Sequence, residues 1–181
     1  MDPFIKDIFQ VASWVVGILG GLILASVAVR QLILNAEQRK SELRWRQANA
    51  AKEAINDIHN NNWARNCVTM LDWSEGKHRL KFEDKSPVEI SYEKDVIPAL
   101  KKSYRECSDV EQDIVYCFDW FFYFIDRIEH YIRTNLIEFA DVEDVLRLYG
   151  GKIRQQEQVY ENFMKVHGYN LASAFWKRYR G

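Results

Sequence analysis

Residues 109–134 read DVEQDIVYCFDWFFYFIDRIEHYIRT. Apolar side chains recur there at alternating spacings of four and three, which is the period of one helix face. The row comprises Ile114, Phe118, Phe121, Ile125, Ile128 and Ile132. Ser108 followed three residues later by Glu111 forms a capping box, which marks the start of a helix. Further aromatic residues on the neighbouring faces predict that this helix is covered on more than one side.

A membrane span is the alternative interpretation of so apolar a stretch. Five charged residues argue against it, because an ionised side chain inside hydrocarbon costs several kcal/mol. They are Asp113, Asp119, Asp126, Arg127 and Glu129. We therefore place this helix at the centre of a folded domain.

The segments on either side of this helix are predicted from the same periodicity and from turn residues. We expect helices over 35–59, 63–73, 92–106, 140–149, 152–166 and 171–179. Stops are expected at Asn60–Asn62, at Gly150–Gly151 and at Gly168. Polar and apolar residues alternate only in 78–83 and 88–92, which indicates a small hairpin or an extended loop.

The N-terminal part of the chain is apolar on all sides. Residues 8–29 contain no charged side chain, and 22 residues at about 1.5 Å each match a hydrocarbon core of roughly 30 Å. A cleaved signal peptide ending near Ser26–Ala28 is the rival interpretation. The N-terminal charges are not net positive and the apolar run exceeds the usual signal length, so we favour an uncleaved anchor.

The charges next to the apolar run predict its orientation. Five cations lie after it, and only Lys6 precedes it. The positive-inside rule then places the N-terminus outside and the C-terminal domain in the cytoplasm. The same cations are expected to lie near anionic lipid headgroups. They are Arg30, Arg39, Lys40, Arg44 and Arg46.

Small residues recur at every fourth position within the apolar run. They are Ser13, Gly17, Gly21 and Ala25. Such a row lets two helix backbones approach closely, as in GxxxG packing. It makes self-association inside the membrane one expectation, although such rows also occur in spans that do not dimerise.

We therefore expect an all-α chain with one N-terminal transmembrane helix and a cytosolic helical bundle that carries a small two-stranded β-hairpin insert. The predicted parts are an anchor over 1–34, a juxtamembrane stalk helix over 35–62 and a helical domain over 63–181. The three cysteines form no CxxC pair and are expected to be unpaired thiols, as suits the cytosol. The net charge of −1 gives no reason to expect nucleic acid as a partner.

One cluster on the central helix has the residue types of catalytic or metal sites. Asp119, Asp126 and His130 lie at i, i+7 and i+11 and therefore share one side of the helix. No third or fourth ligand is adjacent, and structural networks produce such clusters as well. In the structural interpretation, Asp119 is buried by aromatic neighbours and paired to an arginine or a tryptophan N–H. No phosphate-binding glycine loop, nucleophile elbow or HExxH pattern occurs, so we expect no cofactor, no metal and no small-molecule substrate.

The C-terminal residues 175–180 mix aromatic residues with cations. Nucleic acid or a membrane surface would suit this mixture. We favour the structural interpretation, in which the aromatic residues pack inward and the cations are stabilised by the helix C-terminus.

Two stretches carry a resemblance to a known group of proteins. The first joins Arg44–Ala48 to Met70–Trp73, and the second joins Phe118–Phe121 through Ile128–Glu129 to Asn135–Ile137 and Asp144–Val145. Their order resembles that of small bacterial proteins of unassigned function with one N-terminal membrane helix. Some members look like components of phage-defence or abortive-infection loci. The resemblance implies the bacterial inner membrane and no established catalytic residues.

These observations lead us to expect one of three functions. The first is a non-enzymatic, membrane-anchored helical interaction module that binds lipid and either a partner protein or itself, as an effector or sensor in bacterial defence or signalling. The second is an accessory subunit of a larger membrane complex. The third is a hydrolase or nuclease built on the cluster around Asp119.

Overall fold

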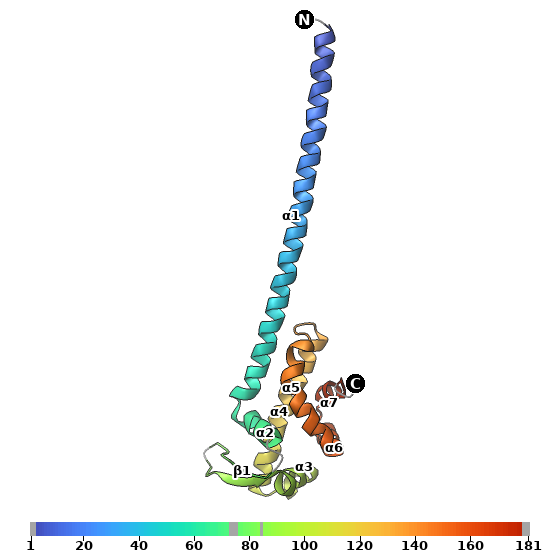
Figure 1. Ribbon diagram of the computed structural model, residues 1–181. Helices are drawn as coiled ribbons and strands as arrows, with labels where there is room; N and C mark the ends of the chain where they lie inside the picture. Colours follow the sequence, from blue (N-terminus) through green and yellow to red (C-terminus); the bar gives the residue numbers. More distant parts are fainter. Residues whose placement is uncertain (1–2, 73–75, 84, 179–181) are drawn as a thin grey trace. The chain divides into compact units, whose positions relative to one another are not determined.

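The computed structural model describes residues 3–72, 76–83 and 85–178, with the side chains of 3–13, 15, 16 and 18 outside the description (Figure 1). It divides into two compact units, Met1–Arg46 and Gln47–Gly181. The described residues form seven α-helices and one two-stranded antiparallel sheet. The predicted mainly helical fold with a small hairpin is thereby confirmed.

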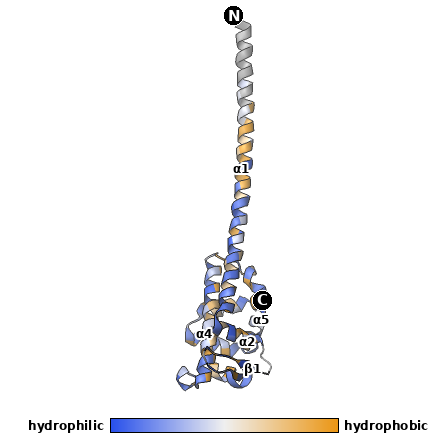
Figure 2. Cartoon of the chain, turned by 90° about the vertical axis from the view of Figure 1, so that its left-hand side faces the viewer, coloured by the Kyte–Doolittle hydropathy of each residue, from blue (hydrophilic) through white to orange (hydrophobic). Residues whose placement is uncertain are grey.

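The first helix, α1, runs from Pro3 to Asn60 and joins the predicted anchor and stalk without a break. Its apolar part is the orange section of α1 in Figure 2, and a charged section comes after it. Among the described residues, one stretch, Leu19–Asn60, contains a window long and apolar enough to cross a membrane. By length and composition α1 is thus a candidate span.

The second unit is built around α4, which runs from Asp109 to Arg133. Ile114, Phe118, Phe121 and Ile125 are completely buried and Ile128 is 1% exposed, as their spacing predicted. Buried residues on neighbouring faces, such as Phe122, show that α4 is covered on more than one side. The helices α2 (Asn62–Asp72), α3 (Ile97–Lys101) and α7 (Asn170–Lys177) all contact it.

The predicted hairpin consists of β1 (Lys77–Leu80) and β2 (Val88–Ser91). The strands are antiparallel, with Lys77 opposite Ser91 and Leu80 opposite Val88. An isolated two-stranded sheet is marginal in water. This one has an apolar inner face, because Leu80 and Ile90 are buried.

One continuous helix over 92–106 was expected, and that prediction is wrong. The segment contains a single π-helical turn, Tyr92–Val96, then α3, then a 3₁₀ turn over Tyr104–Glu106. Pro98 lies in the first turn of α3, where its missing N–H does no harm. Lys102 is extended, with φ −84° and ψ 155°, so the helix ends after five residues.

The expected stop at Gly150–Gly151 is also wrong. Helix α5 runs through both glycines, from Ala140 to Gln155, and α6 comes next, from Glu157 to His167. Each glycine costs a helix about 1 kcal/mol relative to alanine. Packing outweighs this cost, because Tyr149, Gly150 and Ile153 are all buried. The predicted stop at Gly168 is confirmed, since this residue ends α6 in the left-handed conformation with φ 83°.

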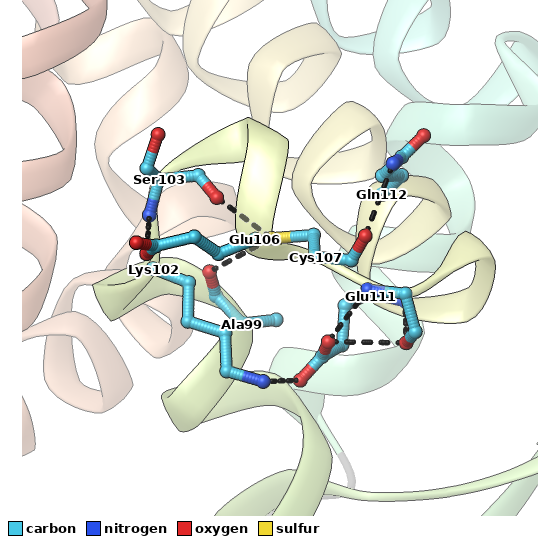
Figure 3. A network of polar contacts seen from close by, with 8 residues as sticks. Ala99, Lys102, Ser103, Glu106, Cys107, Glu111 and Gln112 are labelled. Carbon is cyan, nitrogen blue, oxygen red and sulfur yellow. Dashed lines mark hydrogen bonds and ion pairs between the residues drawn. The ribbon is translucent and has the colours of Figure 1, made fainter.

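A polar network determines where α4 begins (Figure 3). The Ser108 N–H donates to a Glu111 carboxylate oxygen at 2.8 Å, and the Glu111 N–H donates back to Ser108 Oγ at 3.4 Å. The predicted capping box is thus confirmed. Lys102 adds an ion pair to Glu111 at 2.5 Å, which connects the end of α3 to the start of α4. Lys102, and then the Ser108 N–H, lower the pKa of Glu111 from 4.5 to about 2.

This lowered pKa predicts a loss of stability in acid. The folded-state pKa of Glu111 lies below its unfolded value, so its contribution is fully present above about pH 4.5 and is lost as pH falls toward 2. We expect Glu111→Gln to lower the urea midpoint of unfolding at pH 6 and to have a smaller effect at pH 3. The exposed Glu93→Gln serves as the control. An equal deficit of Glu111→Gln at both pH values would contradict the assignment.

Candidate functional site

Asp119 lies on α4, and its side chain contacts the turn that joins α6 to α7. Its Oδ1 atom is 2.7 Å from His167 Nδ1 and accepts a hydrogen bond from the Tyr169 hydroxyl at 3.3 Å. The ring of His167 also stacks on Phe163, with centroids 4.1 Å apart. Burial, and then the nearby Asp119 charge, raise the pKa of Tyr169, so its hydroxyl stays protonated and able to donate. Asp119 therefore fixes the corner between α6 and α7.

Asp126, two turns further along α4, holds the start of α7. Its Oδ1 accepts from the Ala172 backbone N–H at 2.8 Å. The first N–H groups of a helix have no partner within the helix, and a carboxylate there also interacts favourably with the helix dipole. Asp126 thus acts as an N-terminal cap supplied by another helix.

His130, the third member of the predicted cluster, has an exposed side chain, and its backbone carbonyl accepts from Thr134 Oγ1. In the described part of the chain, no three His, Cys, Asp or Glu side chains are grouped so that they could hold a metal ion. The contacts of Asp119 and Asp126 are those of residues that position a helix.

A further acid on α4 was not predicted as part of any site. The side chain of Glu129 is 1% exposed and lies 2.8 Å from Arg133 and 2.7 Å from Arg178. The Arg178 guanidinium also lies 5.4 Å from the centroid of the Phe139 ring. Of the C-terminal aromatic–cation mixture, Phe175 and Trp176 are buried, as the structural interpretation expected.

An open groove lined by aromatic side chains runs beside Asp119. It has a volume of about 280 Å³, and we name it the aromatic groove. It is lined by Tyr116, Asp119, Trp120, Tyr123 and Tyr169. Tyr116 and Tyr123 are 42% and 45% exposed, so their rings are accessible from solvent.

Neighbouring contacts hold the rings of the aromatic groove in place. Trp63 meets Tyr116 edge-on, with centroids 4.8 Å apart and planes at 90°, and its own indole N–H donates to Glu83. Tyr169 is held by its hydroxyl on Asp119. The groove is therefore organised before any ligand arrives.

The residues predicted to act in the membrane lie on α1. Gly17, Gly21 and Ala25 are exposed, and a Cβ atom on either glycine would meet nothing within 4 Å. The side chain of Ser13 lies outside the described residues. The five cations predicted to meet lipid headgroups, Arg30, Arg39, Lys40, Arg44 and Arg46, are all exposed.

All three cysteines are free and buried. Burial raises the pKa values of the Cys67 and Cys117 thiols well above their ordinary range. Reactive cysteines need a lowered pKa and access to solvent. These residues therefore act as small apolar side chains of the core.

The aromatic groove was not predicted from the sequence. The expected partner of Asp119, an arginine or a tryptophan N–H, was wrong, because its side chain is 27% exposed and contacts His167 and Tyr169. The spacing of Tyr116, Trp120 and Tyr123 by four and three was a usable signal, because it places the rings on one helix face with Asp119 between them. The approach of His167 and Tyr169 had no such signal, since it depends on how α6 and α7 pack against α4.

No protein-family model, no curated protein and no solved structure matches this chain. The chemistry of its site is therefore inferred from its own residues.

The capping role of Asp126 predicts a measurable loss of stability. Removing a carboxylate cap costs about 1 kcal/mol, so Asp126→Ala should lower the free energy of unfolding by about that amount in urea denaturation. Asp126→Asn keeps an acceptor oxygen and should lose less. His130→Ala, at an exposed position, is the control and should change stability little. An unchanged stability of Asp126→Ala would overturn this role.

Proposed function

We propose that this chain is a non-enzymatic, membrane-anchored binding module, in which α1 spans a bilayer and the helical domain receives a partner protein in the cytoplasm. One observation carries the anchoring. Nine large aliphatic side chains between Leu19 and Leu34 are exposed. At about 100° per residue they point to all sides of α1, so no single protein face could cover them.

A bilayer is the environment that these side chains favour energetically. Removing each one from water contributes about 1.5–3 kcal/mol, so the set of nine contributes about 14–27 kcal/mol. A hydrocarbon environment surrounds a helix completely and supplies this gain. The five flanking cations, from Arg30 to Arg46, favour the cytoplasmic side for the domain after α1 and add attraction to anionic lipids.

The binding role rests on the aromatic groove. It presents large rings in a preformed hollow, and aromatic residues are enriched where proteins bind partners. In our proposal Asp119 and Asp126 serve to position α7, which argues against the hydrolase alternative. The resemblance of the sequence to small bacterial membrane proteins makes phage defence at the inner membrane the most concrete setting for such a module.

Charges placed within the span should prevent insertion. An arginine near the centre of a span costs about 2.5–3.5 kcal/mol. Arginine at Leu19, Leu22, Ile23 and Leu24 together therefore costs about 10–14 kcal/mol and also removes the gain of four aliphatic side chains, so this variant should move most of the protein from the carbonate-resistant membrane pellet to the supernatant. Leu43→Arg changes an exposed leucine in the charged section of α1 and should leave the protein in the pellet. Recovery of the unmodified chain as a soluble monomer without detergent would refute the anchor.

Self-association through the small-residue row is the proposed means of assembly in the membrane. Gly17→Ile together with Gly21→Ile would keep two helices from approaching closely, so the mass of the detergent-solubilised protein should fall to that of a monomer. Ser26→Ile is the matched control, because at about 100° per residue the exposed Ser26 lies on the opposite side of α1 from the row. An oligomer that survives the double substitution would exclude assembly through this row.

A further inference from the structure

The rings of the aromatic groove form corners rather than a flat stack. Trp120 lies 5.7 Å from Tyr123 and 6.4 Å from Tyr116 between centroids, and both pairs of planes meet at 86°. In such corners, ring faces line two sides of one space. The face of an aromatic ring carries partial negative charge, so a corner of faces favours a cation.

A carboxylate lies among these rings. Asp119 is, among the described residues, the one charged group that lines the aromatic groove. Its contacts to His167 and Tyr169 are both made by Oδ1, and Oδ2 takes part in neither. With 27% of its side chain exposed, Asp119 can pair with an incoming positive group. Rings and carboxylate together complement an organic cation.

The protein already binds one cation on the same face of α4. The guanidinium of Arg127 lies 5.8, 5.7 and 5.6 Å from the ring centroids of Tyr123, Phe124 and Tyr131. It also donates to the Tyr131 hydroxyl at 2.9 Å. Tyr123 also lines the aromatic groove, which offers the same kinds of group to a guanidinium from outside.

The openness of the hollow indicates how the cation is presented. Its rim rings, Tyr116 and Tyr123, are nearly half exposed, so the groove cannot enclose a free small molecule. A side chain that projects from a larger partner needs no enclosure, and an arginine stacks on aromatic faces while pairing with a carboxylate.

We propose that the aromatic groove binds the guanidinium of an arginine side chain carried by a partner polypeptide, between the rings of Trp120 and its neighbours and the carboxylate of Asp119. This inference rests on the proposed function, since it names the chemistry of the partner that the module receives.

The test uses the full-length, ¹⁵N-labelled protein in detergent micelles and a blocked Gly-Arg-Gly peptide. The indole N–H signal of Trp120 should shift and saturate, with a dissociation constant on the order of 10 mM for so small a probe. The same peptide with citrulline, the neutral isostere of arginine, should bind at least about ten-fold more weakly. Free arginine, which has the same net charge but no flanking polypeptide, should bind no tighter than the peptide.

Variants locate the site. Y116L and Y123L each remove an exposed ring and should weaken peptide binding by about five- to ten-fold. The matched control is Y104L, which removes a ring that is 54% exposed outside the aromatic groove and should leave binding unchanged. Circular dichroism and the thermal midpoint establish that each variant is folded. D119N should also weaken binding and should reduce its dependence on salt.

Three results would overturn the inference. They are equal binding of the citrulline and arginine peptides, full binding by the folded Y116L/Y123L double variant, and tighter binding of free arginine than of the peptide. Failure of the proposed function is distinguishable from failure of this inference, because it would release the unmodified chain into the supernatant on carbonate extraction. A chain that stays in the membrane pellet but does not bind the arginine peptide would contradict this inference and leave the proposed membrane-anchored module standing.

Discussion

The burial of α4 is the constraint on which the second unit depends. Phe118, Phe122 and Phe124 are buried, and at about 100° per residue Phe122 and Phe124 lie about 160° apart around the helix. One neighbouring helix could not remove all of them from water, and each buried phenylalanine contributes about 1.5–3 kcal/mol. The surrounding helices must therefore approach α4 from several sides, and this requirement places α7 beside it although some 40 residues separate the two in the chain.

Three acidic residues of α4 contact α7 or the turn before it because of that arrangement. At the edge of the buried surface, Asp119 contacts the corner before α7, Asp126 caps its first turn and Glu129 pairs with Arg178 at its end. A charge half-buried against apolar rings is costly unless it is paired. Three carboxylates on one side of α4 thus select the position of α7, and with it the position of Tyr169 in the aromatic groove.

Local signals explain which parts of this fold could be predicted. The capping box of Ser108 and Glu111, the core row from Ile114 to Ile128 and the left-handed Gly168 each depend on residues close in sequence. The continuation of α5 through Gly150 depends instead on burial against distant segments, which outweighs the intrinsic preference of glycine. Helix α3 ends at Lys101, and the next residue, Lys102, pairs with Glu111 on α4. The partners of Asp119 come from the end of α6 and the residues before α7. These features depend on contacts between different elements, which the sequence pattern of one element does not reveal.

The proposed binding role of the aromatic groove depends on the proposed membrane anchor, because the groove alone supplies little binding energy. A guanidinium gains about 0.5–1 kcal/mol from each exposed ring, so two rings of the open groove contribute about 1–2 kcal/mol, and a partly exposed ion pair with Asp119 adds up to about 1 kcal/mol. A dissociation constant of 1 mM requires about 4.1 kcal/mol, so the groove alone would not hold a partner from dilute solution. A partner confined to the same membrane meets the groove at an effective concentration that can reach the millimolar range. In the proposed function, a weak but charge-selective groove distinguishes among proteins that a bilayer has brought close, and α1 as the proposed anchor supplies the proximity that Trp120 and Asp119 lack the energy to provide.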